Sequence, residues 1–388
     1  MTQDAGPVLC VVGARPNFIK IGPIMRAFAS RAPGLRAVLV HTGQHYDADM
    51  SDKLFADLQL PLPDVNLGVG SGSHSQQTAK VLMAFEPLID RYEPSSVLVV
   101  GDVNSTLACS LVAVKRGVPV VHVEAGLRSR DRGMPEEINR VLTDQIADLL
   151  YITERSARGN LLREGIADER IEFVGNVMID SLHAHRARAP HPHEVVRRLG
   201  GDPAALVAAG RHGVVTLHRP SNVDSRDALR SALGLLREAS ELAPLVWPLH
   251  PRTAQNIKRF ELSGMLESRG LIALPPAGYL DMLGLMGSAS FVITDSGGLQ
   301  EETTALGVPC LTMRENTERP ITVDQGTNTI VGRDRDLLLG QVAEILRGGG
   351  KQGRVPELWD GHASERIVVH LARWLGARAP QSAAQSVA

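Results

Sequence analysis

The segment FVITDSGGLQEETTALGVPCLTM, residues 291–313, carries the pattern that decides the fold. An apolar run ends in Asp-Ser-Gly-Gly, a helical pattern follows, and a second apolar run closes the segment. This order predicts a strand–helix–strand unit of the kind that builds parallel sheets. Ser296, Gly297 and Gly298 would precede the helix, where backbone N–H groups and the helix dipole favour an anion. A glycine turn without a ligand is the alternative interpretation.

Two glutamates follow these glycines inside the predicted helix. A carboxylate there does not help to bind phosphate, but it could accept hydrogen bonds from the ribose of a nucleotide. Arg319, beyond the next apolar run, could add positive charge for the phosphate. No Gly-Lys-Ser/Thr follows the glycines and no strand-linked GxGxxG occurs, which weighs against ATP hydrolysis and nicotinamide binding. Alternatively, Glu301 and Glu302 only stabilise the start of the helix.

Similar apolar runs recur along the chain at 8–14, 36–43, 96–102, 118–126, 214–218, 245–250 and 271–276. They are continuous rather than alternating, which is typical of strands buried on both faces of a parallel sheet. Amphipathic segments separate them, so the sequence predicts an α/β fold with doubly wound sheets. Residues 183–212 are rich in Pro, His, Arg and Gly and carry no strand pattern. We therefore expect two domains, 1–182 and 183–363, and a disordered tail at 378–388.

Bulk composition narrows the function classes. The 388 residues are 43% hydrophobic and 22% charged with a net charge of −2, which disfavours non-specific binding to nucleic acid or anionic membranes. The sequence shows neither a membrane-spanning run nor a signal peptide, so a cytoplasmic protein is expected. Cys10, Cys109 and Cys310 lie in apolar stretches and are interpreted as buried thiols. His183-Ala184-His185, in the segment between the domains, has metal-ligand spacing but is interpreted as incidental, so no metal site is expected.

Polar residues collect where the apolar runs end, which is where open α/β sheets bind ligands. Arg15 and Lys20 follow the first run and could reach a phosphate; a helix-start arginine and a solvated lysine are the alternative. Asp102 and Glu124 end two other runs, and a carboxylate at the end of an apolar strand is costly to bury unless it is paired or used. His218 also ends a run, so it is a candidate for chemistry.

Two further residues lie in MPEEINRVLTDQIADLL, where Pro135 suits the first position of a helix. Glu136 and Arg140 are four residues apart, so a simple intrahelical ion pair worth about 0.3–0.5 kcal/mol is the plain expectation. His122 precedes Glu124 by two residues and is interpreted as a core histidine with satisfied hydrogen bonds rather than as a catalyst.

Taken together, the chain resembles the non-hydrolysing UDP-N-acetylglucosamine 2-epimerases over roughly residues 8–335. Eight motifs carry the resemblance in the same order: VVGARPNFIKIGPI, HTGQHYDADMS, GDVNSTLA, HVEAGLRS, MPEEINRVLTDQIADLLYITE, GNVMIDSL, VTLHRPSNVD and DSGGLQEETTALGVPCLTMRENTERP. The resemblance implies a GT-B architecture, in which two Rossmann-like domains hold the nucleotide sugar between them. A C-terminal helix at about 364–377 is then expected to pack back onto the first domain.

The resemblance also implies an activity. The family interconverts UDP-GlcNAc and UDP-ManNAc without NAD or a metal, by anti-elimination of UDP to 2-acetamidoglucal and re-addition. By motif position Asp102, Glu124, Glu136 and His218 match the catalytic residues, with Arg140 close by. Asp102 and Glu136 are favoured as the acid/base pair at C2, with Glu124 positioning the sugar or acting as a second base. No cofactor is expected, and the family commonly forms homodimers.

The remaining positions match binding residues of the family. His218 would hydrogen-bond the diphosphate or help to protonate it, together with Arg15, Lys20, Arg319 and the amides of Ser296, Gly297 and Gly298. Glu302 matches the ribose-binding glutamate, and Tyr279 lies where the uracil pocket begins. Gln44, His45 and His250 match part of an allosteric site for a second UDP-GlcNAc that some bacterial members have.

The sequence departs from the family at two motifs and leaves other functions open. Many members have Gly-Thr-Arg-Pro-Glu where this chain has Gly-Ala-Arg-Pro-Asn, and His-Arg-Arg-Glu-Asn where it has His-Arg-Pro-Ser-Asn. The alternatives are a 2-epimerase of a UDP-diacetamido uronate, a GT-B glycosyltransferase, a hydrolysing enzyme that releases ManNAc, and a non-catalytic sensor. Three acids near C2 favour an epimerase over a transferase, since a transferase leaves C2 untouched.

Overall fold

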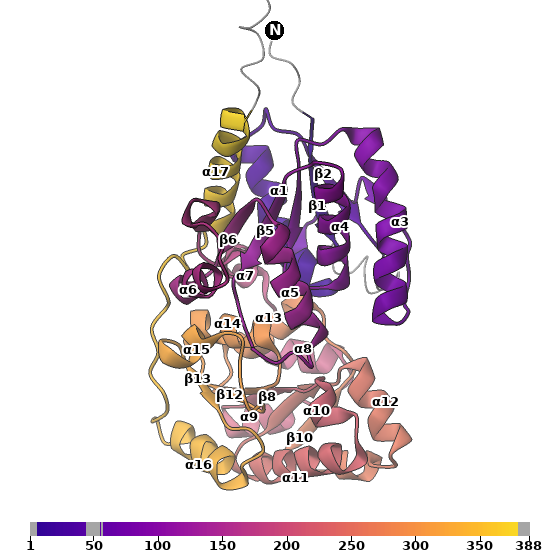
Figure 1. Ribbon diagram of the computed structural model, residues 1–388. Coiled ribbons are helices and arrows are strands. Elements are labelled where there is room, and N and C mark those ends of the chain that lie inside the picture. Colours follow the sequence, from indigo (N-terminus) through magenta and orange to yellow (C-terminus); the bar gives the residue numbers. More distant parts are fainter. Residues whose placement is uncertain (1–5, 44–54, 56, 379–388) are drawn as a thin grey trace, which may run out of the picture. The chain divides into compact units, whose positions relative to one another are not determined.

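The computed structural model describes residues 6–43, 55 and 57–378. The chain divides into two compact units, each with its own sheet and helices (Figure 1). The N-terminal unit comprises residues 1–181 together with the returning segment 357–388, and the C-terminal unit comprises residues 182–356.

The N-terminal unit is built on a seven-stranded sheet with the order β3-β2-β1-β4-β5-β6-β7, and its strand pairs are all parallel. Its strands are β1 (Val8–Val12), β2 (Ala37–His41), β3 (Val65–Asn66), β4 (Ser96–Val100), β5 (Val120–Ala125), β6 (Leu149–Ile152) and β7 (Ile171–Phe173). The connection from β1 to β2 runs toward one edge of the sheet, and the connection from β4 to β5 runs toward the other. Right-handed crossovers therefore place their helices, α1 (Arg15–Arg31) and α4 (Asn104–Lys115), on opposite faces. The predicted doubly wound α/β fold is confirmed for this unit.

Helices cover both faces of this sheet. Figure 1 shows α17 beside α1, and α3, α4 and α5 together on the other side. The other helices of the unit are α3 (His74–Tyr92), α5 (Pro135–Ile146), α6 (Arg155–Arg163), the 3-10 turn η1 (Asp168–Arg170), α7 (Val177–His185), which ends in the next unit, and α17 (Ala363–Arg378).

The returning segment packs on the N-terminal unit from Glu357 onward, earlier than the helix start near 364 that the sequence suggested. The buried Trp359 donates its indole N–H to the Thr153 carbonyl at 3.0 Å. Asp180 then caps α17, because its carboxylate accepts the backbone N–H groups of Ala363 and Ser364 at 3.1 and 2.6 Å. These contacts fix the segment and the first turn of its helix.

The C-terminal unit is built on a six-stranded parallel sheet with the order β10-β9-β8-β11-β12-β13. Its strands are β8 (Gly213–Thr216), β9 (Leu245–Pro248), β10 (Leu271–Leu274), β11 (Phe291–Thr294), β12 (Cys310–Thr312) and β13 (Asn328–Ile330). Its helices are η2 (Arg186–Arg188), α8 (Pro192–Arg198), α9 (Ala204–Ala209), α10 (Pro220–Val223), α11 (Arg226–Leu242), α12 (Pro251–Arg259), η3 (Ser263–Leu266), α13 (Tyr279–Gly287), α14 (Gly297–Leu306), α15 (Pro320–Asp324) and α16 (Arg335–Leu346).

Four strands were not identified from the sequence: β3, β6, β7 and β13. Three of them have two or three residues and lie at or beside a sheet edge, so they lack a long apolar run. The strand β6 is fully buried, but its Leu-Leu-Tyr-Ile run directly follows the helical pattern of α5 and reads as its continuation.

Candidate functional site

The turn between β1 and α1 is held by Asn17. Its side-chain oxygen accepts the backbone N–H groups of Gly13 and Ala14 at 3.3 and 3.0 Å, and its amide donates to the Val100 carbonyl at 2.8 Å. Asn17 thus joins the carboxyl ends of β1 and β4, the point where the strand order reverses. An asparagine can therefore cap this helix at the position where many relatives carry glutamate.

Lys20 and Glu124 form a buried ion pair within the N-terminal unit. Their side chains are only 6% and 4% exposed, so Lys20 is not the solvated lysine of the alternative interpretation. Glu124 has a left-handed φ of 72°, and the pairing of β5 with β6 shifts register between Val123 and Ala125. A bulge with a non-glycine residue in this conformation re-aims a side chain at some cost in strain, as is common at functional sites.

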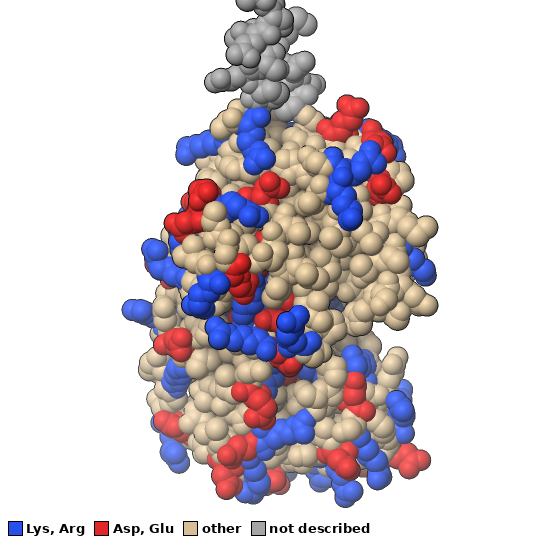
Figure 2. Space-filling view, viewed as in Figure 1, with Lys and Arg blue, Asp and Glu red and all other residues tan. Residues whose placement is uncertain are grey.

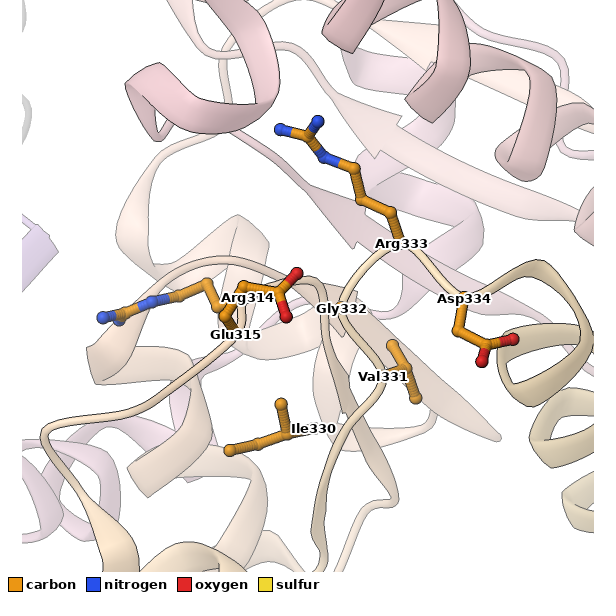
Figure 3. Close-up of a pocket in the computed structure, with 7 residues that line it drawn as sticks. All are labelled: Arg314, Glu315, Ile330, Val331, Gly332, Arg333 and Asp334. Carbon is orange, nitrogen blue, oxygen red and sulfur yellow. The ribbon is translucent and has the colours of Figure 1, made fainter.

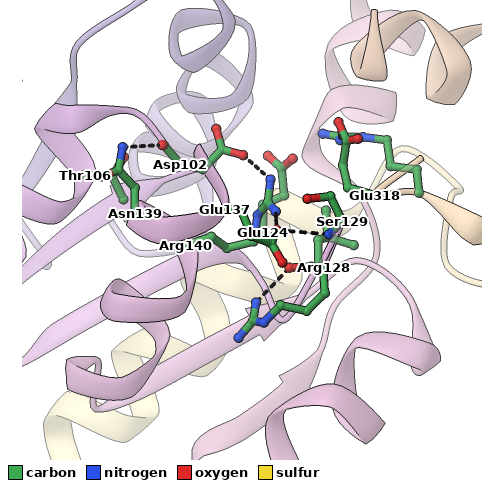
Figure 4. A network of polar contacts seen from close by, with 12 residues as sticks. Asp102, Thr106, Glu124, Arg128, Ser129, Glu137, Asn139, Arg140 and Glu318 are labelled. Atoms are coloured by element: carbon green, nitrogen blue, oxygen red, sulfur yellow. Dashed lines mark hydrogen bonds and ion pairs between the residues drawn. The ribbon is translucent and has the colours of Figure 1, made fainter. Parts of the chain in front are cut away.

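Arg140 joins two carboxylates in the same unit (Figure 4). Its guanidinium pairs with Asp102 at the end of β4 and, at 2.6 Å, with Glu137 on its own helix. The side chain of Asp102 is 21% exposed, whereas those of Arg140 and Glu137 are 3% and 4% exposed. The helix begins at Pro135 as expected, and Glu136 is half-buried in its first turn.

Glu137 was not identified from the sequence, because it reads as a second first-turn acid beside Glu136. In the structure its two oxygens also accept the backbone N–H groups of Ser129 and Arg130 at 2.9 Å each. Glu137 therefore ties the loop after β5 to Arg140 and, through it, to Asp102.

His122 is a core residue, as the sequence analysis expected. Its ring is 0% exposed, with Nδ1 2.6 Å from Asp144 and Nε2 donating to the Gly101 carbonyl at 2.8 Å. Burial alone would raise the pKa of Asp144, but His122 and Arg128 more than offset burial and lower it. The histidine thereby fixes the backbone just before Asp102.

The imidazole of His218 is held by Asp295, a residue to which the sequence alone assigns no role. Nδ1 of His218 lies 3.0 Å from the fully buried carboxylate, and the side chain is 30% exposed. Asp295 also accepts the backbone N–H groups of His218 and Arg219 and the Asn222 amide, all at 2.9–3.0 Å. The two residues follow β8 and β11, which are adjacent where the strand order reverses. Holding Nδ1 leaves Nε2 to act on a ligand.

The helix α14 begins beside a group of arginines. Arg319 pairs with Glu301 at 2.9 Å and with Glu318 at 2.8 Å, so its charge is balanced within the protein. Arg314 and Arg219 lie 2.8 and 3.9 Å from Glu318. The sequence predicts Arg319 and the glycines at this site, but not the set of compensating charges, because the charged residues come from three separate segments.

Glu302 and Tyr279 meet in the same unit. Burial and the neighbouring Glu301 raise the pKa of Glu302 to about 7, and the nearby Tyr279 hydroxyl lowers it in part. Burial and the neighbouring Glu302 raise the pKa of Tyr279 well above its usual range. Ser296 is the N-cap residue of α14, and Gly297 and Gly298 open the helix. Glu302, Tyr279 and the Ser296–Gly298 segment therefore all lie in the C-terminal unit.

Arg15 begins α1, and burial lowers its pKa although Asp57 partly offsets the effect. Gln44 and His45 lie outside the described residues. The exposed His250 caps α12, accepting the Arg252 backbone N–H at 3.2 Å, and its ring centroid is 5.2 Å from that of His218.

A depression of about 370 Å³ lies where β12 and β13 end (Figure 3). Arg314 and Glu315 line it from one strand end, and Gly332, Arg333 and Asp334 from the other. Arg333 reaches the Ser221 carbonyl and Asn222, so this rim adjoins the hydrogen bonds around Asp295.

The three cysteines are buried as predicted, and burial raises the pKa of the Cys310 thiol to about 11. Among residues 6–43, 55 and 57–378, no group of three or more His, Cys, Asp or Glu side chains could hold a metal ion. No helix in these ranges is long and apolar enough to cross a membrane. On the face in Figure 2, basic and acidic side chains are interspersed.

A sequence model of the family described as UDP-N-acetylglucosamine 2-epimerase matches residues 28–372 of the chain. The chain belongs to this family. It is 40% identical over 361 residues to the UDP-N-acetylglucosamine 2-epimerase of Methanocaldococcus jannaschii, covering 92% of this chain and 96% of that one. It is also 41% identical over 369 residues to the UDP-2,3-diacetamido-2,3-dideoxy-D-glucuronate 2-epimerase of Pseudomonas aeruginosa, covering 94% and 99%.

The fold also matches that of a family member with a solved structure. The crystal structure of the Methanocaldococcus jannaschii UDP-GlcNAc 2-epimerase in complex with UDP-GlcNAc and UDP matches with a TM-score of 0.84 at 38% identity, covering 95% of this chain and 99% of that one. The predicted GT-B fold is therefore confirmed at the level of the family.

Proposed function

We propose that the protein interconverts UDP-N-acetylglucosamine and UDP-N-acetylmannosamine. In the forward direction a base takes the C2 proton, the C–H electron pair forms the C1=C2 bond, and UDP leaves with the C1–O pair. UDP then re-adds at C1 while a proton is delivered to the opposite face of C2. The observation that carries the proposal is the pair of cation-bound carboxylates, Asp102 and Glu124, at the ends of adjacent strands.

The roles of the acids follow from their exposure. Asp102 is 21% exposed and can reach a substrate, so we assign it to proton transfer at C2, with Glu136 as its partner. Glu124 is 4% exposed and bound to Lys20, which favours positioning of the sugar over direct proton transfer. Arg140 orients Asp102 and is a positioning residue.

The C-terminal unit would bind the UDP moiety. Ser296, Gly297 and Gly298 would bind the diphosphate at the start of α14, with Arg319 beside them. Glu302 would accept the ribose hydroxyls, and Tyr279 would border the uracil. His218, oriented by Asp295, would hydrogen-bond or protonate the departing diphosphate.

Sequence identity supports a second candidate function, the 2-epimerisation of a UDP-linked diacetamido uronate. Identity to the Pseudomonas aeruginosa uronate 2-epimerase is 41%, against 40% for the Methanocaldococcus jannaschii UDP-GlcNAc 2-epimerase. Both reactions invert C2 of a UDP-linked acetamido sugar, so the same acids would serve either substrate.

Turnover assays separate these functions. The protein is incubated with UDP-GlcNAc alone, and the products are resolved by anion-exchange chromatography. UDP-ManNAc is the expected product. Accumulation of ManNAc and UDP would indicate hydrolysis, whereas no reaction with UDP-GlcNAc and turnover of the diacetamido uronate would transfer the assignment to that sugar.

We further propose that the protein is a homodimer. Below a charged cluster at the upper end of α3, the face in Figure 2 has an area largely without charged side chains. Met83 on α3 is 76% exposed, and Ile138 and Leu142 on α5 are 43% and 46% exposed. Exposed apolar side chains on neighbouring helices are a common feature of subunit interfaces. Light scattering after size-exclusion chromatography should give twice the chain mass; a monomer mass would contradict this proposal.

A further inference from the structure

The carboxylate of Glu318 lies among three guanidinium groups of the C-terminal unit. Its Oε2 is 2.8 Å from Arg314 Nη1, and its Oε1 is 2.8 Å from Arg319 Nη1 and 3.9 Å from Arg219 Nη2. The side chain is 3% exposed. Burial would raise its pKa, but the three arginines more than offset burial and hold the pKa far below its usual range. Glu318 is therefore a buried anion.

This anion lies at the start of α14. A Cβ added to Gly297, the first residue of that helix, would come within 2.5 Å of Glu318 Oε1 and 2.8 Å of Arg319 Nη1. The start of a helix carries partial positive charge and binds anions. The Glu318 carboxylate thus lies beside the first residue of a glycine-opened helix, next to the place where such a helix start would bind a phosphate.

The surrounding charges nearly balance without a ligand. Three arginines, Arg219, Arg314 and Arg319, face the two carboxylates of Glu318 and Glu301, which leaves one net positive charge. A diphosphate bound here would approach Glu318, and like charges brought together in a partly buried site repel strongly.

We propose that Glu318 is a built-in counter-anion that lowers the affinity of the site for UDP. The inference rests on the proposed function. In an elimination and re-addition, UDP must leave C1 and attack it again, so a site that held UDP too tightly would favour the intermediate state over both sugars. An alternative role, in which Glu318 only orders the arginines for the phosphate, predicts the opposite sign for its removal.

Calorimetric titration of UDP into the purified full-length protein at one fixed ionic strength tests the sign. Glu318→Gln keeps the shape of the side chain and removes its charge, and we expect a Kd for UDP at least about tenfold lower than in the wild type. Glu318→Asp keeps the charge and should stay within about threefold of the wild type. Glu315→Gln is the matched control, because Glu315 is an exposed carboxylate on the same loop, and it should leave the Kd unchanged.

Removing a negative charge beside three arginines, of which Arg314 and Arg319 are buried, will lower the melting temperature of the ligand-free variant. UDP should then raise the melting temperature of Glu318→Gln by more than that of the wild type, which gives a second measurement if the ligand-free variant is poorly folded. Weaker or unchanged UDP binding by Glu318→Gln would overturn the inference about Glu318 but not the proposed function. If the wild type fails to bind UDP, the proposed function fails as well.

Discussion

Replacement of Asp295 by asparagine tests how His218 is prepared for chemistry. The carboxylate accepts hydrogen bonds from two backbone N–H groups, the Asn222 amide and Nδ1 of His218, all at 2.9–3.0 Å. Asparagine retains one acceptor oxygen, but its N–H₂ group would face the N–H donors that the second carboxylate oxygen now accepts. Since a hydrogen bond to a charged group contributes about 1.5–3 kcal/mol, we expect a loss of about 2–4 kcal/mol in the free energy of unfolding.

The same change should affect catalysis and its pH dependence. In Asp295→Asn one amide oxygen replaces the two carboxylate oxygens that the hydrogen-bond donors share, so the hydrogen bond that orients the ring through Nδ1–H weakens and kcat/KM should fall about 100-fold or more. Burial would raise the pKa of Asp295, but His218 and Asn222 lower it below its usual value. Because the pKa of Asp295 is lower in the folded protein than in the unfolded chain, its ionisation stabilises the fold. This stabilisation is complete above the pKa of about 3.9 in the unfolded chain, and it is lost as the pH falls through the lower pKa of the folded protein.

Urea unfolding at several pH values and steady-state kinetics measure both effects. The difference in unfolding free energy between the wild type and Asp295→Asn should narrow below about pH 4. Asp227→Asn, an exposed residue in the first turn of α11, is the control and should change stability by no more than about 0.5 kcal/mol. Wild-type kcat/KM in Asp295→Asn would refute the reasoning, because the ring would then need no carboxylate.

Three other substitutions follow from the structure. Arg140→Ala leaves Asp102 and Glu137 without their shared cation, so the free energy of unfolding in urea should fall by about 3–5 kcal/mol and kcat should fall sharply. A near-wild-type kcat would contradict the orienting role of Arg140. Trp359→Ala removes a buried indole that anchors the returning segment and should cost about 3–5 kcal/mol; less than 1 kcal/mol would show that this anchor is dispensable. Glu302→Gln should gain up to about 3 kcal/mol of stability relative to the wild type as the pH rises from about 4.5 to 7, because burial raises the pKa of Glu302 to about 7 and its ionisation opposes folding. Thermal unfolding of both proteins at pH 5 and pH 8 checks this prediction. An equal difference in stability at the two pH values would contradict it.

The sequence predicted the fold well where strands are long and apolar. The runs at 8–14, 96–102 and 291–296 all became central strands, because burial on both faces requires continuous apolar residues. The edge strand β13 contains Asn-Thr-Ile, which carries no such signal. The return of the chain at Glu357 depends on Trp359 and Asp180, and a contact between residues so far apart in sequence leaves no local pattern.

The site was predictable residue by residue but not as a set of interactions. Asp102, Glu124 and His218 follow strands, so their placement at strand ends could be inferred. Their partners could not, because the pairing of Lys20 with Glu124 depends on the spatial order of the strands. Asp295 had a detectable signal, since it ends a buried strand directly before the glycines, but its motif was attributed to the phosphate alone.

Proton transfer at C2 is the central claim, and proton NMR of the protein with UDP-GlcNAc in D₂O tests it most directly. The sample contains no acceptor, NAD or added metal. The account predicts that UDP-ManNAc appears and that the C2 proton signal disappears from both epimers as deuterium is incorporated. Unchanged UDP-GlcNAc, or UDP-ManNAc that retains its C2 proton, would contradict the account.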